Sequence, residues 1–190
     1  MSARLIYVLG PSGAGKDSVL DWLKTHIAGH PEVNAQVHWT RRSITRAAVA
    51  GGEAHESLPV ETFDQLQLAG AFALSWQANG LSYAIRRDEI SPLVRGGWVF
   101  VNGSRAYLPT AAQLFPELLV LHITANPQSL RLRLMARGRE THERINARLA
   151  RTADLGPLHH PRMIEVSNDQ TLEETGRAVL AQLKQLPGWP

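Results

Sequence analysis

The sequence predicts an α/β fold with a central parallel sheet between two layers of helices, and short apolar runs are the first reason. They are found at 5–9, 98–101, 118–123 and 163–166. Nearly continuous apolar runs of this length are typical of parallel strands that are buried on both faces. Three of the runs are followed by segments with helical spacing of apolar residues, at about 16–27, 127–135 and 171–186. Strands that alternate with helices in this way predict a three-layer domain.

A glycine-rich turn follows the first apolar run and precedes the first predicted helix. Its glycines let the backbone fold so tightly that several N–H groups point at one spot, where the helix N-terminus adds partial positive charge. Lys16 adds a full charge for the outer phosphates of a nucleotide. This order of strand, turn and helix identifies a P-loop of the form G-x-x-x-x-G-K-[ST], as in P-loop NTPases. The residues expected to hold the nucleotide are Gly10, Pro11, Ser12, Gly13, Ala14, Gly15, Lys16, Asp17 and Ser18.

The P-loop departs from the usual pattern at the position after the lysine. A Ser or Thr is expected there to hold magnesium, but this chain has Asp17, and Ser18 comes one residue later. We therefore expect Mg²⁺ as a cofactor, with Asp17 or Ser18 as its ligand on the protein.

The composition limits the class of protein. The 190 residues suit one α/β domain with an insertion or two, and 44% hydrophobic residues are enough for a core. The chain has no cysteine, which excludes disulfides and cysteine-ligated zinc. No apolar run approaches the roughly 20 residues of a membrane span, and no signal-peptide pattern is present, so we expect a cytoplasmic protein without membrane contact. The net charge is only +3, and the absence of a basic tract interleaved with aromatic residues disfavours nucleic-acid binding.

Residues 40–90 are predicted to form a small β-rich insertion between strands of the core. The Asn79-Gly80 pair is a strong signal for a hairpin turn, and it joins predicted strands at 71–76 and 81–85. A short amphipathic helix is predicted before them, at 59–70. The insertion is therefore expected to carry a small sheet of its own.

Three arginines, Arg41, Arg42 and Arg46, stand at the start of this insertion. A solvated loop is the plain explanation of such a run, but a P-loop protein also needs a site for its acceptor. We therefore expect these arginines to hold an anionic group. Glu53 follows in a polar, hinge-like stretch, where it orients an arginine, binds a substrate hydroxyl or belongs to the plain surface.

The apolar run at 98–101 ends in a polar turn that contains Asn102 and Ser104. Ligands of open α/β sheets bind at the carboxyl ends of the strands, so this turn is expected to face the site. P-loop enzymes usually carry a magnesium-binding Asp at this strand end, where the present chain offers an amide and a hydroxyl.

Seven arginines lie within the 21 residues of 131–151. They are Arg131, Arg133, Arg137, Arg139, Arg144, Arg148 and Arg151. An exposed helix pair laced with salt bridges would need fewer of them, so we expect a cationic lid that closes over a triphosphate. The chain is thus predicted to be a single domain, with a core, an acceptor-binding insertion and a lid. The core covers 1–39, 91–135 and 152–190, the insertion 40–90 and the lid 136–151.

The chemistry of the acceptor follows from what these residues offer. Phosphoryl transfer depends mainly on positioning and on neutralising charge. A neutral hydroxyl acceptor would require a carboxylate base beside it, and no such motif is found. An anionic phosphate needs no base but needs cations that hold two anions together, which the arginines supply. The residues therefore favour a kinase whose acceptor is itself a phosphate ester.

The chain resembles the guanylate kinase superfamily of P-loop kinases over about residues 5–170. The matching segments are G-P-S-G-A-G-K at 10–16, S-I-T-R at 43–46, G-E at 52–53, G-x-x-Y at 80–83, R-L-x-x-R-G at 133–138, I-N-x-R-L at 145–149 and N-D at 168–169. The resemblance implies that Arg46 and Tyr83 bind the acceptor phosphate. It places Asn168 and Asp169 near the adenine of ATP, and it assigns Arg133, Arg137 and Arg148 to ATP and the transferring group.

The departures from this superfamily are informative. Guanylate kinases recognise guanine with a glutamate in the stretch that is here F-A-L-S-W, and this chain has Leu74 at that position. A leucine accepts no hydrogen bonds from a purine, so guanine recognition is expected to be absent. The departures are similar to those of a narrower family, the ribose 1,5-bisphosphate phosphokinases of bacterial phosphonate breakdown. The shared segments are 15–18, 74–81, 101–106, 137–140 and 145–151.

This second resemblance implies transfer of the γ-phosphoryl group of ATP to the 1-phosphate of ribose 1,5-bisphosphate, which gives 5-phosphoribosyl 1-diphosphate and ADP. The implied catalytic residues are Lys16, Arg137 and Arg148. The implied substrate-binding residues are Arg42, Arg46, Glu53, Tyr83, Asn102 and Ser104. A nucleoside monophosphate kinase that acts on GMP and a non-catalytic guanylate-kinase-like module that binds proteins are the alternatives. A monomer or a homodimer is expected.

Overall fold

The computed structural model describes residues 4–47, 54–136, 138, 141–154 and 156–190, with the backbone alone for residues 148 and 151–154. The chain divides into two compact units. One consists of Met1–Tyr7 and His30–Leu118, and the other of Val8–Gly29 and Leu119–Pro190. The first unit carries the predicted acceptor residues and the second carries the P-loop.

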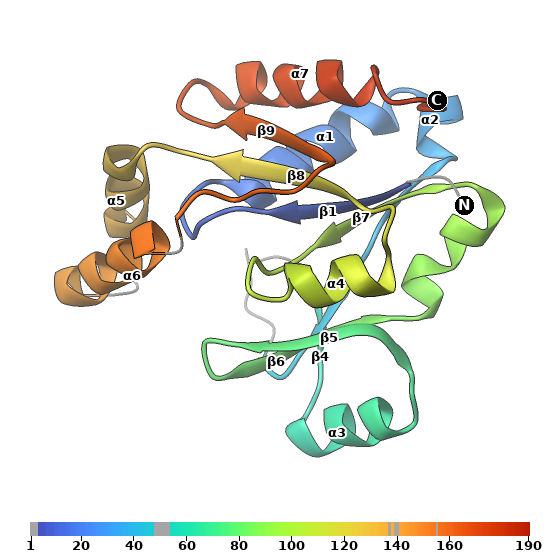
Figure 1. Cartoon of the computed structure of the whole chain (residues 1–190), viewed down its shortest axis with the longest axis horizontal. Coiled ribbons are helices and arrows are strands. Elements are labelled where there is room, and N and C mark those ends of the chain that lie inside the picture. Colours follow the sequence, from blue (N-terminus) through green and yellow to red (C-terminus); the bar gives the residue numbers. More distant parts are fainter. Residues whose placement is uncertain (1–3, 48–53, 137, 139–140, 155) are drawn as a thin grey trace. The chain divides into compact units, whose positions relative to one another are not determined.

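A five-stranded sheet confirms the predicted α/β fold (Figure 1). Its strands are β1 (Leu5–Leu9), β2 (Val37–Trp39), β7 (Trp98–Asn102), β8 (Leu119–Thr124) and β9 (Met163–Ser167). Their order is β2-β7-β1-β8-β9, and the edge strands β2 and β9 each run parallel to their neighbour. Every residue of β1 and β7 is buried, as the continuous apolar runs predict.

The P-loop unit is built on β8, β9 and two long helices. Helix α1 (Lys16–Ala28) buries Val19, Leu20, Leu23 and Ile27, which recur at helical spacing. Helix α7 (Leu172–Leu183) begins at a capping box formed by Thr171 and Glu174. Helices α5 (Pro127–Ala136) and α6 (His142–Asp154) carry five of the seven clustered arginines, and Arg137 and Arg139 lie outside the described residues.

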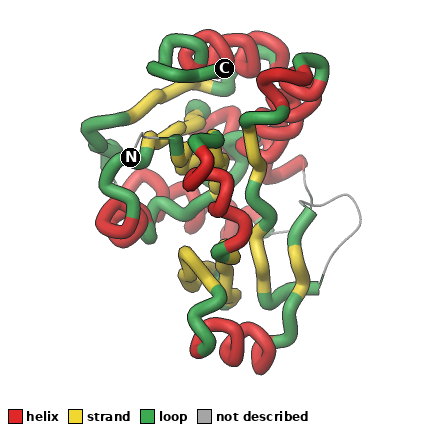
Figure 2. The backbone as a smooth tube through the Cα atoms, turned by 90° about the vertical axis from the view of Figure 1, so that its right-hand side faces the viewer, coloured by secondary structure: helices red, strands yellow, loops and turns green. Residues whose placement is uncertain are grey.

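A second sheet of four strands forms most of the predicted insertion (Figure 2). Its strands are β3 (Arg42–Ile44), β4 (Glu56–Ser57), β5 (Phe72–Ala78) and β6 (Leu81–Arg86), in the order β4-β3-β6-β5. Asn79 and Gly80 both adopt positive φ between β5 and β6, which confirms the predicted hairpin turn. Strand β3 was not predicted, because its polar, arginine-rich sequence favours a loop.

Shorter elements complete the first unit. They are α2 (Pro31–Asn34), α3 (Val60–Leu68), the 3-10 helix η1 (Asp88–Arg95) and α4 (Leu108–Leu114). Helix α2 begins at Pro31, whose fixed φ favours the first turn of a helix. Among the described residues, no helix is long and apolar enough to span a membrane.

The small sheet has two different faces, which the strand register defines. Cross-strand partners share a face, so Trp76, Tyr83 and Ile44 lie together on one side. A register shift between Phe72 and Leu74 turns Phe72 to the other side, where it packs on Phe63 of α3. The first face is therefore free of α3 and carries the aromatic residues discussed below.

Candidate active site

The P-loop adopts the tight conformation that phosphate binding needs. Lys16 Nζ donates to the carbonyl oxygen of Gly10 at 3.0 Å, so the ammonium group lies across the loop. Gly15 immediately precedes α1 with φ +82, and a Cβ at this position would overlap the side chain of Asn168. The loop therefore leads directly into the helix N-terminus, where backbone N–H groups and a partial positive charge favour an anion.

The side chain of Asn168 is hydrogen-bonded to the backbone of the P-loop. Its side chain is 5% exposed, and its Nδ2 donates to the carbonyl oxygen of Ala14 at 2.7 Å. Its Oδ1 accepts from the hydroxyl of Thr175 at 2.9 Å. The side-chain amide is thus engaged by the protein itself. The backbone N–H also has a partner, the carbonyl oxygen of Thr124 at 2.8 Å, so the predicted contact with adenine stays a prediction.

Arg133 lies beside the P-loop with one nitrogen engaged. Its Nη2 donates to the carbonyl oxygen of Asn168 at 2.6 Å. Its Nη1 is buried, has no hydrogen-bond partner among the described residues, and lies 3.9 Å from the point where a Cβ of Gly15 would be. A buried donor without a partner is costly, and an anion bound at the loop would satisfy it.

The carboxylate of Asp169 accepts several hydrogen bonds from neighbouring residues of the protein. Its carboxylate accepts from Asn126 through the backbone N at 3.0 Å and Nδ2 at 2.9 Å, and from the hydroxyl of Ser167 at 2.6 Å. The hydroxyl of Ser167 and the backbone N–H of Asn126 hold the pKa of Asp169 below its usual value. The carboxylate therefore fixes the turn that leaves β8.

Asp17 and Ser18 lie in the exposed first turn of α1. Their oxygen atoms are the kind of ligand that magnesium prefers. The described residues contain no group of three or more His, Cys, Asp or Glu side chains that would hold a metal ion by themselves. A magnesium ion here would depend on one of these two side chains together with the phosphates of a nucleotide.

An aromatic stack lies on the face of the small sheet that is free of α3. The rings of Trp76 and Tyr83 are 5.6 Å apart and inclined by 7°, and both residues are more than 90% buried. Tyr107 stacks on Trp76 at the same centroid distance. The guanidinium of Arg42 lies 5.4 Å from the centre of the Tyr83 ring, which places a cation and a phenol side by side.

Leu74 lies on the same face as this stack, but only 1% of it is exposed. Other side chains cover it, so it lines no open surface in this structure. The predicted absence of guanine recognition stays a prediction, and Trp76 on the same face is as relevant to it as Leu74.

The polar turn after β7 is anchored by a residue that the sequence argument missed. Tyr7 of β1 donates its hydroxyl to the carbonyl oxygen of Ser104 at 3.0 Å and accepts from the Ser104 backbone N–H at 2.9 Å. Asn102, at the end of β7, is buried. A tyrosine in an otherwise aliphatic buried strand is the signal that could have identified this anchor.

An ion pair in the small sheet was also missed. Glu56 of β4 accepts from Nε and Nη2 of Arg86 and from the hydroxyl of Ser43. The hydrogen bonds from Arg86 are the main reason that the pKa of Glu56 lies below its usual value. This pair joins β4 to β6 across β3, so it holds the sheet that carries Arg42 and Tyr83.

Several predicted residues are placed only in part. Arg46 is exposed, and its carbonyl oxygen accepts from His55 Nε2 at 3.2 Å. Arg137 and Glu53 lie outside the described residues, and Arg148 is placed on α6 by its backbone alone. The predicted lid therefore remains a prediction.

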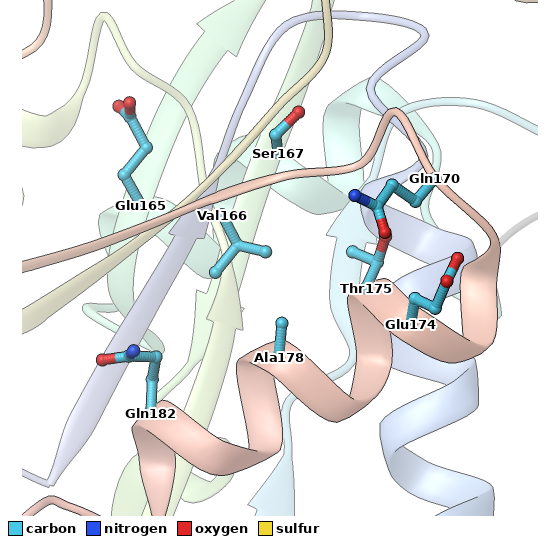
Figure 3. Close-up of a pocket in the computed structure, with 8 residues that line it drawn as sticks. All are labelled: Glu165, Val166, Ser167, Gln170, Glu174, Thr175, Ala178 and Gln182. Carbon is cyan, nitrogen blue, oxygen red and sulfur yellow. The ribbon is translucent and has the colours of Figure 1, made fainter.

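A separate pocket of about 310 Å³ lies between β9 and α7 (Figure 3). Glu165, Ser167 and Glu174 line it, but their polar groups are engaged with His122, Asp169 and Thr171. These three side chains therefore already have hydrogen-bond partners within the protein, and we place no function in this pocket.

Comparison with known proteins gives the family. No family model matches the chain. Ribose 1,5-bisphosphate phosphokinase PhnN from Pseudomonas fluorescens (strain SBW25) is 46% identical over 187 residues, which cover 96% of each chain. The proteins of the same name from Pseudomonas paraeruginosa (strain DSM 24068 / PA7) and Azotobacter vinelandii (strain DJ / ATCC BAA-1303) are each 44% identical, with 96% and 97% of each chain covered. The chain belongs to the ribose 1,5-bisphosphate phosphokinase family.

Solved structures agree on the fold. The guanylate kinase from Anaplasma phagocytophilum superposes with a TM-score of 0.65 at 15% sequence identity, and the match covers 99% of this chain and 88% of that one. A sugar kinase from Janibacter sp. HTCC2649 superposes with a TM-score of 0.52 at 14% identity, over 98% of each chain. At such low identity the likeness shows the fold alone. This member of the ribose 1,5-bisphosphate phosphokinase family thus has a P-loop kinase fold.

Proposed function

We propose that this chain transfers the γ-phosphoryl group of ATP to the 1-phosphate of ribose 1,5-bisphosphate and so forms 5-phosphoribosyl 1-diphosphate and ADP. The observation that carries the proposal is the match of 44–46% identity over nearly the whole length of three phosphokinases of that name. The P-loop geometry and the absence of a base motif from the sequence both support it.

The donor is held by the P-loop unit in this proposal. Lys16 and the N–H groups of residues 10–18 bind the β- and γ-phosphates. The buried Nη1 of Arg133 donates to the same anion, which gives this nitrogen its missing partner. Asp17 or Ser18 holds Mg²⁺, which neutralises charge on the triphosphate when it is bound.

The acceptor is held by the other unit. Arg42, Arg46 and Tyr83 bind its phosphate groups, and Glu53, Asn102 and Ser104 contact the ribose hydroxyls. The cation beside the Tyr83 ring supports this assignment, because an arginine and a phenol both donate to phosphate oxygens.

The transfer itself is a displacement at the γ-phosphorus. An oxygen of the acceptor's 1-phosphate forms a bond to this phosphorus, and the bond to the oxygen that bridges to the β-phosphate breaks, which releases ADP. The attacking oxygen is already anionic, so no base has to remove a proton. Arg137 and Arg148 close over the transferring group as the lid (136–151) moves, and Lys16 stabilises the leaving charge.

The proposal also covers the location, the oligomeric state and the partners of the protein. The protein works on small molecules in the cytoplasm as a monomer or homodimer, without nucleic acid or membrane. A guanylate kinase is the second candidate because of the shared fold, but the filled aromatic face disfavours a purine acceptor. Lys16 and its place in the P-loop disfavour a non-catalytic binding module.

The test offers ribose 1,5-bisphosphate and GMP in parallel, each with Mg²⁺ and ATP. ADP release is measured, and the product is identified by phosphorus NMR. Turnover with the ribose compound and a new pyrophosphate signal are expected. Turnover with GMP alone would replace the proposal with the guanylate kinase alternative, and a Lys16→Met variant controls for contaminating activity.

A further inference from the structure

Tyr7 is an unusual residue for the middle of β1. The other four residues of the strand are aliphatic, and the whole strand is buried. Burying a phenol hydroxyl costs free energy unless it is hydrogen-bonded, so packing alone would favour a phenylalanine. Here the hydroxyl meets both backbone groups of one residue, the N–H and the carbonyl of Ser104. These groups belong to the turn after β7 and are beyond the last paired residue of that strand.

The ring of Tyr7 also touches the turn. A Cβ at Gly103 would overlap three ring atoms of Tyr7, so the ring lies directly against the backbone at this glycine. The Ser104 carbonyl oxygen accepts a further hydrogen bond from the backbone N–H of Tyr107 at 3.2 Å. The turn is thus held by the side chain of Tyr7 and by a hydrogen bond from the backbone of Tyr107.

The turn held by Tyr7 adjoins the aromatic stack through Tyr107, whose backbone N–H donates to the Ser104 carbonyl and whose ring stacks on Trp76. Burial raises the pKa of Tyr7, the hydrogen bond to Ser104 lowers it, and the Tyr107 phenol and the Arg42 guanidinium act on it more weakly. The net rise favours the protonated hydroxyl, which donates to the Ser104 carbonyl. Tyr107 and Arg42 both contact rings of the aromatic stack described above.

We propose that Tyr7 is a positioning residue for the acceptor: it holds the 102–104 turn so that Asn102 and Ser104 meet the sugar in one fixed geometry. The inference rests on the proposed function, in which these two residues contact the acceptor. Tyr7 touches no substrate, and it acts only through the backbone of Ser104. A turn that is already ordered costs less to bind, so the benefit falls on the acceptor and not on ATP.

The kinetic test uses Tyr7→Phe, which keeps the ring against Gly103 and removes only the hydroxyl. We expect the KM for ribose 1,5-bisphosphate to rise about tenfold, with kcat and the KM for ATP within about twofold of wild type. Ile6→Val is the matched control, because it removes one methylene from the adjacent buried position of the same strand. A merely structural role would lower the active fraction and leave both KM values unchanged in both variants.

A second readout does not depend on the substrate. Amide hydrogen exchange of Ser104, followed by NMR without ligands, should be about tenfold faster or more in Tyr7→Phe and unchanged in Ile6→Val. Unchanged exchange in Tyr7→Phe would overturn the anchor. Two results in Tyr7→Phe would overturn the positioning role. One is faster exchange with an unchanged KM for the acceptor, and the other is an equal rise in the KM for ATP and for the acceptor. A wild-type protein that does not use ribose 1,5-bisphosphate would instead refute the proposed function, while the exchange result would still decide the anchor.

Discussion

Arg86 of β6 donates two hydrogen bonds to the carboxylate of Glu56 in β4, from Nε at 2.7 Å and from Nη2 at 2.8 Å. The hydroxyl of Ser43 adds a third at 2.5 Å. Two parallel bonds between a guanidinium and a carboxylate define both distance and orientation. The edge strand β4 is only two residues long, and this pair adds to the short backbone pairing that it makes with β3.

Replacing Glu56 with Gln should destabilise the protein by about 1–2 kcal/mol at pH 7, because the charge-assisted bonds are lost and both partners are about a quarter exposed. The folded-state pKa of Glu56 is lowered, so its contribution is present above the unfolded pKa and is lost as pH falls through the folded pKa. Urea unfolding at pH 7 and at acid pH should show the gap between wild type and variant closing. Glu61→Gln on the exposed side of α3 is the control, and a gap that is independent of pH would contradict the assignment.

Replacing Arg133 with Met should weaken ATP binding about tenfold or more. The variant loses the buried Nη1 beside Gly15, which we expect to donate to the phosphates of ATP. The KM for the acceptor should stay within about twofold. Titration with a fluorescent ATP analogue measures the change. Arg177→Met, an exposed change on α7, should leave the affinity as it is, and equal affinity in the two variants would refute the role of Arg133.

Replacing Asn168 with Ala should cost about 2–3 kcal/mol of stability and also weaken ATP, because two buried hydrogen bonds are broken and the Ala14 carbonyl loses its partner. Thr175→Val, which breaks only the second of these bonds, should cost less. Thermal unfolding and ATP titration are measured together. If Asn168→Ala loses the expected stability but binds ATP as tightly as wild type, the side chain of Asn168 does not determine the conformation of the P-loop.

Replacing Asp17 with Asn or Ser18 with Ala should raise the Mg²⁺ concentration for half-maximal activity about tenfold in at least one of the two variants. The variant with the larger rise identifies the ligand. Asp21→Asn, one turn further along α1, serves as the control for a lost surface charge. If both single variants and their combination keep the wild-type Mg²⁺ dependence, neither residue holds the ion.

Replacing Leu74 with Glu should destabilise the protein and should not create activity towards GMP. The side chain is 1% exposed, and a buried carboxylate without a partner costs several kcal/mol or unfolds the strand. Circular dichroism and the GMP assay are measured on the same sample. A folded variant that phosphorylates GMP would mean that Leu74 alone decides against guanine.

The sequence predicted the elements whose signals are local. The buried strands, the P-loop, helix α1 and the Asn79-Gly80 hairpin each follow from residues next to one another in the chain. Strand β3 was missed because its arginines resemble a solvated loop, and only pairing with β6 makes it a strand.

The contacts that organise the candidate site could not be predicted in the same way. Tyr7 and Ser104 are 97 residues apart, and Asn168 and Ala14 are 154 apart. The residues next to each side chain favour a simpler interpretation: Tyr7 would be a packed core residue, and Asn168 would be part of a polar turn. Only the folded chain shows that the hydroxyl and the amide have backbone partners.

The strand order β2-β7-β1-β8-β9 has a consequence for biosynthesis. Strand β1 is made first, yet both of its neighbours in the sheet are made much later, β7 at Trp98–Asn102 and β8 at Leu119–Thr124. Asn168, which supports the loop after β1, emerges later still. A nascent chain on the ribosome therefore carries a P-loop without this support at least until residue 168 has been made.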